Sequence, residues 1–291
     1  MAETILERVK KPGVLVADGS TGVMLQSMGL ELGMAPEVWV LERPETIREL
    51  HRAYINAGSD FILTCTFGGT RLRLEDSELG NCTVEVNRRA TELARAEAGE
   101  HVFVAGDIGP TGMLLDPLGE LTYGAAVEAF AEQVTGLTEG GVDLLYIETM
   151  SDLREVQAAI EGARRVSDLP IFATMTFDTN GRTMMGTKPE DAAEALLGWG
   201  ASVVGGNCGH APEEMEGVIS AMHTAFPDVP LIAKPNAGLP KLVDGVAVYD
   251  IEPEAMARYA KRYVELGAKI VGGCCGSTPA HLAAIVQAVK G

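Results

Sequence analysis

Eight short apolar runs alternate with helix-like segments along almost the whole chain of 291 residues. Their nearly continuous apolar character is typical of strands that are buried on both faces of a parallel sheet. Eight strand-helix units are the number that closes a (β/α)8 barrel. The runs are Val14–Asp18, Phe61–Phe67, Val102–Ile108, Leu144–Thr149, Ile171–Phe177, Ser202–Cys208, Leu231–Asn236 and Lys269–Cys275.

The segments between these runs carry helix signals. In Glu45–Ala57 apolar residues recur at a spacing of three to four, and Gly58 follows as a cap. A doubly wound open sheet is the competing α/β architecture. However, the glycines after the first run, Gly19 and Gly22, do not form the dinucleotide fingerprint Gly-x-Gly-x-x-Gly. We therefore predict a single (β/α)8 TIM barrel, with residues 1–291 as one domain.

The charge and residue composition limit the binding partners and the cellular location that we expect for this protein. The net charge is -18, from 41 acidic and 23 basic residues, so nucleic acid and anionic membrane surfaces are disfavoured. No apolar run approaches the ~20 residues that span a bilayer. The five cysteines show no disulfide spacing, and the charged N-terminus has no apolar signal core. These features predict a soluble, cytoplasmic protein that acts on small molecules or another protein.

Three glycine-flanked cysteines form the most specific chemical signal. Cys208 ends the sixth run, while Cys274 and Cys275 end the eighth. The carboxyl ends of barrel strands share one mouth, so the three thiols are expected to meet there. Three thiolates suit zinc and leave a fourth position for a substrate. Neighbouring residues of a strand face opposite ways, so this requires that the backbone leave the β conformation at the Cys274–Cys275 pair.

Other polar side chains follow the strands to the same mouth. Asp18 and Glu148 are carboxylates that could pair with a substrate ammonium, or serve only as helix caps or rim salt bridges. Thr66 and Phe67 end the second run. Asn236 lies between the two cysteine strands, where its amide could complete the zinc shell or simply bond a loop.

Two long connections are expected to cover the site, because function in barrels concentrates in the loops after strands. They run from about Gly19 to Pro44 and from about Gly109 to Tyr123. The two remaining cysteines, Cys65 and Cys82, are predicted to be packing or incidental surface thiols.

At these residues the chain resembles the homocysteine S-methyltransferase family, and in particular the homocysteine-binding barrels of cobalamin-dependent methionine synthases. The resemblance covers nearly the whole chain, and its motifs together are highly specific. They are Asp18-Gly19-Ser20-Thr21-Gly22, Thr64-Cys65-Thr66-Phe67-Gly68, Gly106-Asp107-Ile108-Gly109-Pro110-Thr111-Gly112, Ile147-Glu148-Thr149-Met150-Ser151-Asp152, Gly206-Asn207-Cys208-Gly209, Pro235-Asn236-Ala237-Gly238 and Gly272-Gly273-Cys274-Cys275-Gly276.

The resemblance implies that homocysteine is activated as a zinc thiolate and methylated to methionine. One Zn2+ per chain would be held by the cysteines, and substrate would be bound by residues around them. The zinc ligands implied are Cys208, Cys274 and Cys275, and the substrate-binding residues are Asp18 and Glu148 for the amino group, glycine-rich backbone including Gly19 and Ser20 for the carboxylate, and Thr66, Phe67 and Asn236.

No donor site is visible, and only a short helix follows Cys275. The methyl group is therefore expected in trans, and the resemblance favours methylcobalamin on a separate corrinoid protein. A small onium donor, S-methylmethionine or betaine, is the alternative. Two other classes of protein are alternatives to a methyltransferase. One is a phosphate-binding (β/α)8 lyase or isomerase, in which Gly272-Gly273 and Gly276-Ser277-Thr278 would cradle a phosphate at a helix N-terminus. The other is a non-catalytic subunit that binds zinc and homocysteine.

Overall fold

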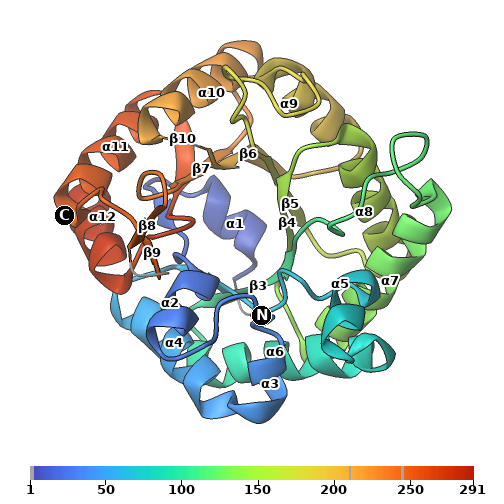
Figure 1. Ribbon diagram of the computed structural model, residues 1–291. Helices are drawn as coiled ribbons and strands as arrows, with labels where there is room; N and C mark the ends of the chain where they lie inside the picture. Colours follow the sequence, from blue (N-terminus) through green and yellow to red (C-terminus); the bar gives the residue numbers. More distant parts are fainter. Residues whose placement is uncertain (1–2, 210, 244–245) are drawn as a thin grey trace.

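Eight parallel strands form a nearly closed barrel in the computed structural model, which describes residues 3–209, 211–243 and 246–291. The strand order is β1-β10-β7-β6-β5-β4-β3-β2. Figure 1 shows the helices surrounding the strands. The predicted barrel is confirmed. Its strands are β1 (Leu15–Val16), β2 (Phe61–Leu63), β3 (Phe103–Ile108), β4 (Leu144–Met150), β5 (Ile171–Met175), β6 (Val203–Cys208), β7 (Leu231–Pro235) and β10 (Ala268–Val271).

Five strands end earlier than predicted, and the largest differences, at β2 and β10, shape the mouth. β2 ends at Leu63, and a tight turn follows in which the Thr66 amide donates to the Thr64 carbonyl at 2.9 Å. β10 ends at Val271, so Cys274 and Cys275 lie outside the strand. The backbone thus leaves the β conformation at the cysteine pair, which is the condition predicted for both thiols to share one metal ion.

The seam between β1 and β2 is closed partly by side chains. The Asp60 amide donates to the Val16 carbonyl at 2.7 Å, and the Val16 amide donates to Asp60 Oδ2 at 2.7 Å. The Leu63 amide donates to Asp18 Oδ2, also at 2.7 Å. One oxygen of Asp18 therefore helps to close the seam between β1 and β2.

The outer layer consists of helices that follow the strands. The predicted helix at Glu45–Ala57 is found one residue earlier, as α4, and Gly58 ends it with a φ of 99°. Among the described residues, no helix combines the length and apolar character needed to cross a membrane. The helices are α2 (Thr21–Ser27), α3 (Val38–Glu42), α4 (Pro44–Asn56), α5 (Arg71–Leu74), α6 (Thr83–Ala98), α7 (Tyr123–Gly140), α8 (Leu153–Val166), α9 (Pro189–Gly198), α10 (Pro212–Ala225), α11 (Pro253–Glu265) and α12 (Pro279–Lys290), with 3-10 turns η1 (Glu75–Ser77) and η2 (Gly80–Cys82).

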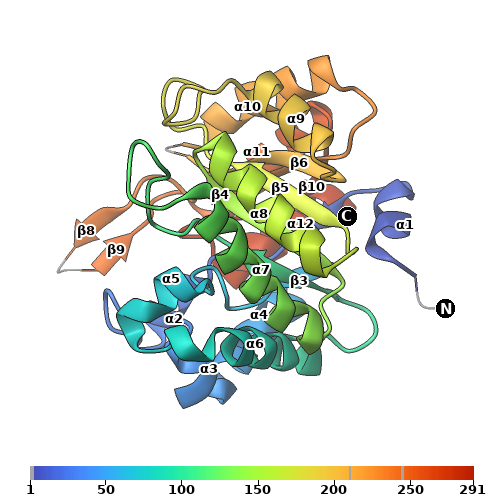
Figure 2. The same ribbon diagram turned by 90° about the vertical axis from the view of Figure 1, so that its right-hand side faces the viewer.

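The two ends of the barrel are closed differently. Helix α1 (Ile5–Lys10) lies at the amino end of the strands, where Ile5 and Val9 join the apolar interior of the barrel. A hairpin of β8 (Lys241–Val243) and β9 (Val246–Val248), which the sequence did not reveal, follows β7. Figure 2 shows α1 and this hairpin at opposite ends of the barrel. The carboxyl end thus carries the loops and the candidate site.

Candidate active site

The three predicted cysteines come together at the mouth. Their sulfur atoms all lie within 4.8 Å of one another, and Cys208 Sγ is 2.9 Å from Cys274 Sγ. Cys208 ends β6 with a φ of 59°, and this left-handed turn is followed by Gly209. Among the described residues, these are the side chains that could together hold a metal ion. Three thiols at this spacing are a donor set that suits zinc or another thiophilic cation.

A buried asparagine, Asn207, orients the thiols from behind. Its Nδ2 lies 3.7 Å from the sulfur atoms of both Cys208 and Cys274. Its Oδ1 is fixed by the Thr149 amide at 2.8 Å and the Thr174 hydroxyl at 2.7 Å. Asn207 belongs to the motif Gly206-Asn207-Cys208-Gly209, but no role was predicted for it. Its position directly before Cys208 was the available signal.

Asn236 ties the two cysteine loops together. Its Nδ2 donates to the Gly209 carbonyl at 2.7 Å, and its Oδ1 accepts from the Cys275 amide at 3.0 Å. Of the two roles considered for Asn236, the structure shows the loop hydrogen bonds. These two contacts fix the loops that carry Cys208 and Cys275 relative to each other.

Gly276 allows the cysteine turn to pack against the segment after β9. Its φ is 80°, and a Cβ there would collide with the ring of Tyr249. Only glycine satisfies both the backbone conformation and the contact. Tyr249 thereby covers one side of the thiol cluster.

The three thiols differ in their pKa values. Hydrogen bonds from Cys208 and Cys274 lower the pKa of Cys275 to about 3. The hydrogen bonds to Cys274 and Cys275, together with burial, raise the pKa of Cys208 well above its usual value. At neutral pH the metal-free cluster therefore holds a thiolate beside protonated thiols. A divalent cation would displace those protons, so metal binding and proton release are coupled.

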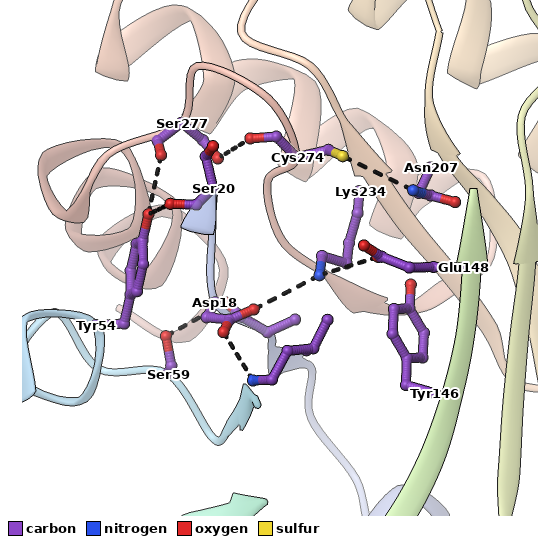
Figure 3. Close-up of polar contacts among 12 residues, drawn as sticks. Asp18, Ser20, Tyr54, Ser59, Tyr146, Glu148, Asn207, Lys234, Cys274 and Ser277 are labelled. Carbon is purple, nitrogen blue, oxygen red and sulfur yellow. Dashed lines mark hydrogen bonds and ion pairs between the residues drawn. The ribbon is translucent and has the colours of Figure 1, made fainter. Parts of the chain in front are cut away.

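A buried lysine, Lys234 on β7, stands between the two predicted carboxylates. Its Nζ lies 3.5 Å from Asp18 Oδ1 and 3.6 Å from Glu148 Oε2 (Figure 3). Burial alone would lower the pKa of Lys234, but Glu148, Tyr146 and Asp18 raise it well above its usual value. The side chain is therefore a cation. Lys234 was not among the predicted site residues, although a lysine is unusual inside an apolar run such as Leu231–Asn236.

The other acidic groups of the mouth are also perturbed. Burial raises the pKa of Glu148 to about 7, and Lys234 partly offsets this effect. Burial and the nearby Glu148 raise the pKa of Asp107 well above its usual value. Thr66 is buried, and its hydroxyl donates to the Asp107 carbonyl at 2.7 Å.

A cavity of about 870 Å³ opens beside the thiols. The connection after β1 lines it, as predicted, whereas the connection after β3 contributes none of the lining residues. Asp18 is not part of the lining, and Asn236 instead lines a second cavity of about 360 Å³ that also reaches Cys208. Buried Cys65 and the unpredicted Lys234 do line the larger cavity. The predicted site residues in this lining are Gly19, Ser20, Thr66, Phe67, Glu148, Cys208, Cys274 and Cys275.

Fold and site together define a (β/α)8 barrel enzyme with a three-cysteine centre at the carboxyl end of its strands. Residues 15–289 match the sequence profile of the family described as Homocysteine S-methyltransferase. The chain belongs to this family, which confirms the resemblance drawn from the motifs.

Known relatives agree with this assignment. Methionine synthase of Mycobacterium tuberculosis is 32% identical over 305 residues, which cover 99% of this chain and 25% of that protein. Methionine synthase of Mycobacterium leprae is 32% identical over 307 residues, with the same coverage. The chain thus spans about a quarter of the length of these relatives. Homocysteine methyltransferase MmuM from Escherichia coli, in its metallated form, shares the fold, with a TM-score of 0.81, 24% identity and coverage of 96% of this chain and 98% of that one.

Proposed function

We propose that this protein is a zinc-dependent methyltransferase that methylates homocysteine to methionine. The observation that carries the proposal is the cluster of three cysteine sulfurs, within 4.8 Å of one another, on the wall of a cavity in a barrel of this family. Methionine synthase and homocysteine methyltransferase activities among its relatives support the same acceptor.

The chemistry requires a deprotonated sulfur. A free thiol has a pKa near ~8.5 and is mostly protonated at neutral pH. When bound, zinc supplies the positive charge that lowers the pKa of a coordinated thiol. Asn207 and Asn236 keep the three cysteine sulfurs in place for this ion. Their contribution is orientation, because neither side chain can accept the thiol proton.

Substrate orientation is assigned to the polar residues that line the cavity together with the cysteines. Glu148 and Lys234 both line it, so a zwitterionic amino acid meets groups of both signs there. Gly19 and Ser20, at the end of β1, form the neighbouring wall. In this proposal, an acceptor whose charged groups bind these residues has its sulfur directed toward the cysteines. Binding in this orientation lowers the entropic cost of reaching the reactive geometry.

The phosphate-binding alternative is not retained. It would need free backbone N–H groups in the turn after β10. The Ser277 amide instead donates to the Cys274 carbonyl at 3.2 Å, and the Thr278 amide donates to His281 Nδ1 at 3.1 Å. Membership of the methyltransferase family points the same way.

We assign the methyl donor to a protein-borne methylcobalamin, because the mouth carries an apolar rim. Of the eleven exposed large apolar side chains among the described residues, nine lie outside helices, on the segments that follow β1, β3, β5 and β7. Loops of this kind suit docking of another protein domain. A small onium donor would need an aromatic cage, yet Phe67 is the one aromatic residue in the described lining of the larger cavity. The rim residues are Leu32, Met34, Met113, Leu114, Leu118, Met184, Met185, Leu239 and Val248.

Anaerobic turnover of the zinc-loaded protein tests this function. Methionine formation from homocysteine would be measured with protein-bound methylcobalamin, free methylcobalamin, S-methylmethionine and betaine, with Cys208→Ser as the inactive control. We expect turnover with methylcobalamin. Turnover with an onium donor alone would overturn the donor assignment and keep the acceptor. If no donor supports methylation at full zinc content, the proposed activity is wrong and a binding role replaces it.

A further inference from the structure

Lys234 occupies the place where a substrate ammonium is expected. The two carboxylate oxygens nearest its Nζ, Asp18 Oδ1 and Glu148 Oε2, belong to the residues assigned to the amino group of the acceptor. The lysine side chain is only 2% exposed, and its ammonium also lies 5.0 Å from the centre of the Tyr146 ring. Figure 3 shows the ammonium between the two carboxylates, with Tyr146 beside it. The chain thus supplies its own cation for this pair.

This cation changes what the cavity demands of a substrate. Two buried carboxylates without a counter-charge would strongly select a ligand that brings an ammonium. With Lys234 in place, much of that demand is already met from within the protein. A second ammonium at the same oxygens would also lie close to that of Lys234, and like charges repel.

Lys234 also offers a positive group to the ligand. An ammonium has three N–H donors, and Lys234 lines the cavity while facing two carboxylates. A donor remains for an anionic group of the acceptor, such as its carboxylate. The site therefore combines a thiol-activating centre with a cationic anchor.

We propose that Lys234 is a specificity-determining residue that extends the acceptors of this enzyme to thiol carboxylates without an α-amino group. This inference rests on the proposed function. In the transfer, the acceptor sulfur forms a bond to the methyl carbon while the bond from that carbon to the donor breaks. The donor atom keeps the electron pair of the broken bond, and the thiol proton passes to solvent.

Calorimetry on the zinc-loaded protein separates the two ends of the acceptor. The ligands are homocysteine, γ-mercaptobutyrate, which lacks the amino group, and γ-mercaptopropylamine, which lacks the carboxylate. For the wild-type protein we expect γ-mercaptobutyrate to bind within about tenfold of homocysteine, and γ-mercaptopropylamine to bind at least about tenfold more weakly than γ-mercaptobutyrate. A preference for homocysteine over γ-mercaptobutyrate of more than about a hundredfold would overturn the inference.

The substitution Lys234→Met should reverse the order of the two analogues, because the carboxylates then demand an ammonium from the ligand. Lys188→Met, at an exposed lysine outside the cavity, is the matched control and should leave the order unchanged. An unchanged order in a folded, zinc-loaded Lys234→Met protein would contradict the inference. The wild-type comparison decides the question even if that variant does not fold. Failure of homocysteine itself to bind would instead refute the proposed function.

Discussion

The two ends of the barrel use the same strands in opposite ways. At the amino end, Ile5 and Val9 of α1 pack on apolar interior residues, and Ile5 is only 1% exposed. At the carboxyl end, the interior instead holds Lys234, Asp18 and Glu148, all buried. Apolar burial contributes stability directly, whereas buried charges must be paired to be tolerated at all. The comparison separates an end that stabilises the fold from an end that is organised for chemistry.

The contribution of the buried Glu148 carboxyl to stability depends on pH. Burial raises the pKa of Glu148 from 4.5 to about 7. Between these values the folded protein binds more protons at this carboxyl than the unfolded chain does. The contribution of Glu148 to stability is therefore greatest below pH 4.5 and is lost as the pH rises through about 7.

The largest expected effect is loss of the metal from the mouth. Cys208→Ser, Cys274→Ser or Cys275→Ser should each remove most of the bound zinc and of the activity, because each removes an anionic ligand. Elemental analysis with an activity assay measures both. Cys82→Ser lies outside the cluster and serves as control. Full zinc content in all three variants would refute the assignment of the ligands.

The opposite result is expected at the amino end. Ile5→Ala should lower the free energy of unfolding by about 2–3 kcal/mol, since it removes buried methyl groups and leaves a cavity. Zinc stoichiometry and homocysteine affinity should not change. Denaturant unfolding and metal analysis on the same sample check this, and a loss of zinc from the folded variant would break the proposed separation of the two ends.

A smaller effect on zinc binding is expected from substitution of Asn207, which contacts the thiols. Asn207→Ala removes the amide that contacts Cys208 and Cys274, and we expect zinc affinity to fall by about 10- to 100-fold, as is usual for residues that orient ligands. Competition with a zinc chelator measures this. Asn56→Ala, at an exposed asparagine of α4 outside the cavity, is a suitable comparison. Equal affinities in the two variants would remove Asn207 from the site.

The smallest effect is expected at the apolar rim. Leu118→Glu should slow methyl transfer from a protein-bound donor by about tenfold and leave stability within about 0.5 kcal/mol. Val166→Glu is a matched control, because Val166 is also exposed but ends α8 at the amino end of the strands. Equal rates in both variants would argue against docking at this rim.

Local sequence patterns determined the barrel and the position of its thiols. The count of apolar runs fixed eight strands, and the ends of the sixth and eighth runs placed Cys208, Cys274 and Cys275 at one mouth. These predictions succeed because the apolar residues of a buried strand are consecutive in the sequence, so a run shows where the strand lies and which residues follow its carboxyl end. The same patterns overestimated the length of β2 and β10, since apolar character continues into the turns that follow.

Only the tertiary structure decided the partners of Lys234 and Asn207. Lys234 on β7 meets Asp18 after β1 and Glu148 on β4, and Asn207 on β6 is fixed by Thr149 and Thr174 from β4 and β5. None of these partners is near in sequence. Their proximity follows from closure of the barrel, which brings side chains of different strands into one interior and makes their charges and hydrogen bonds interdependent.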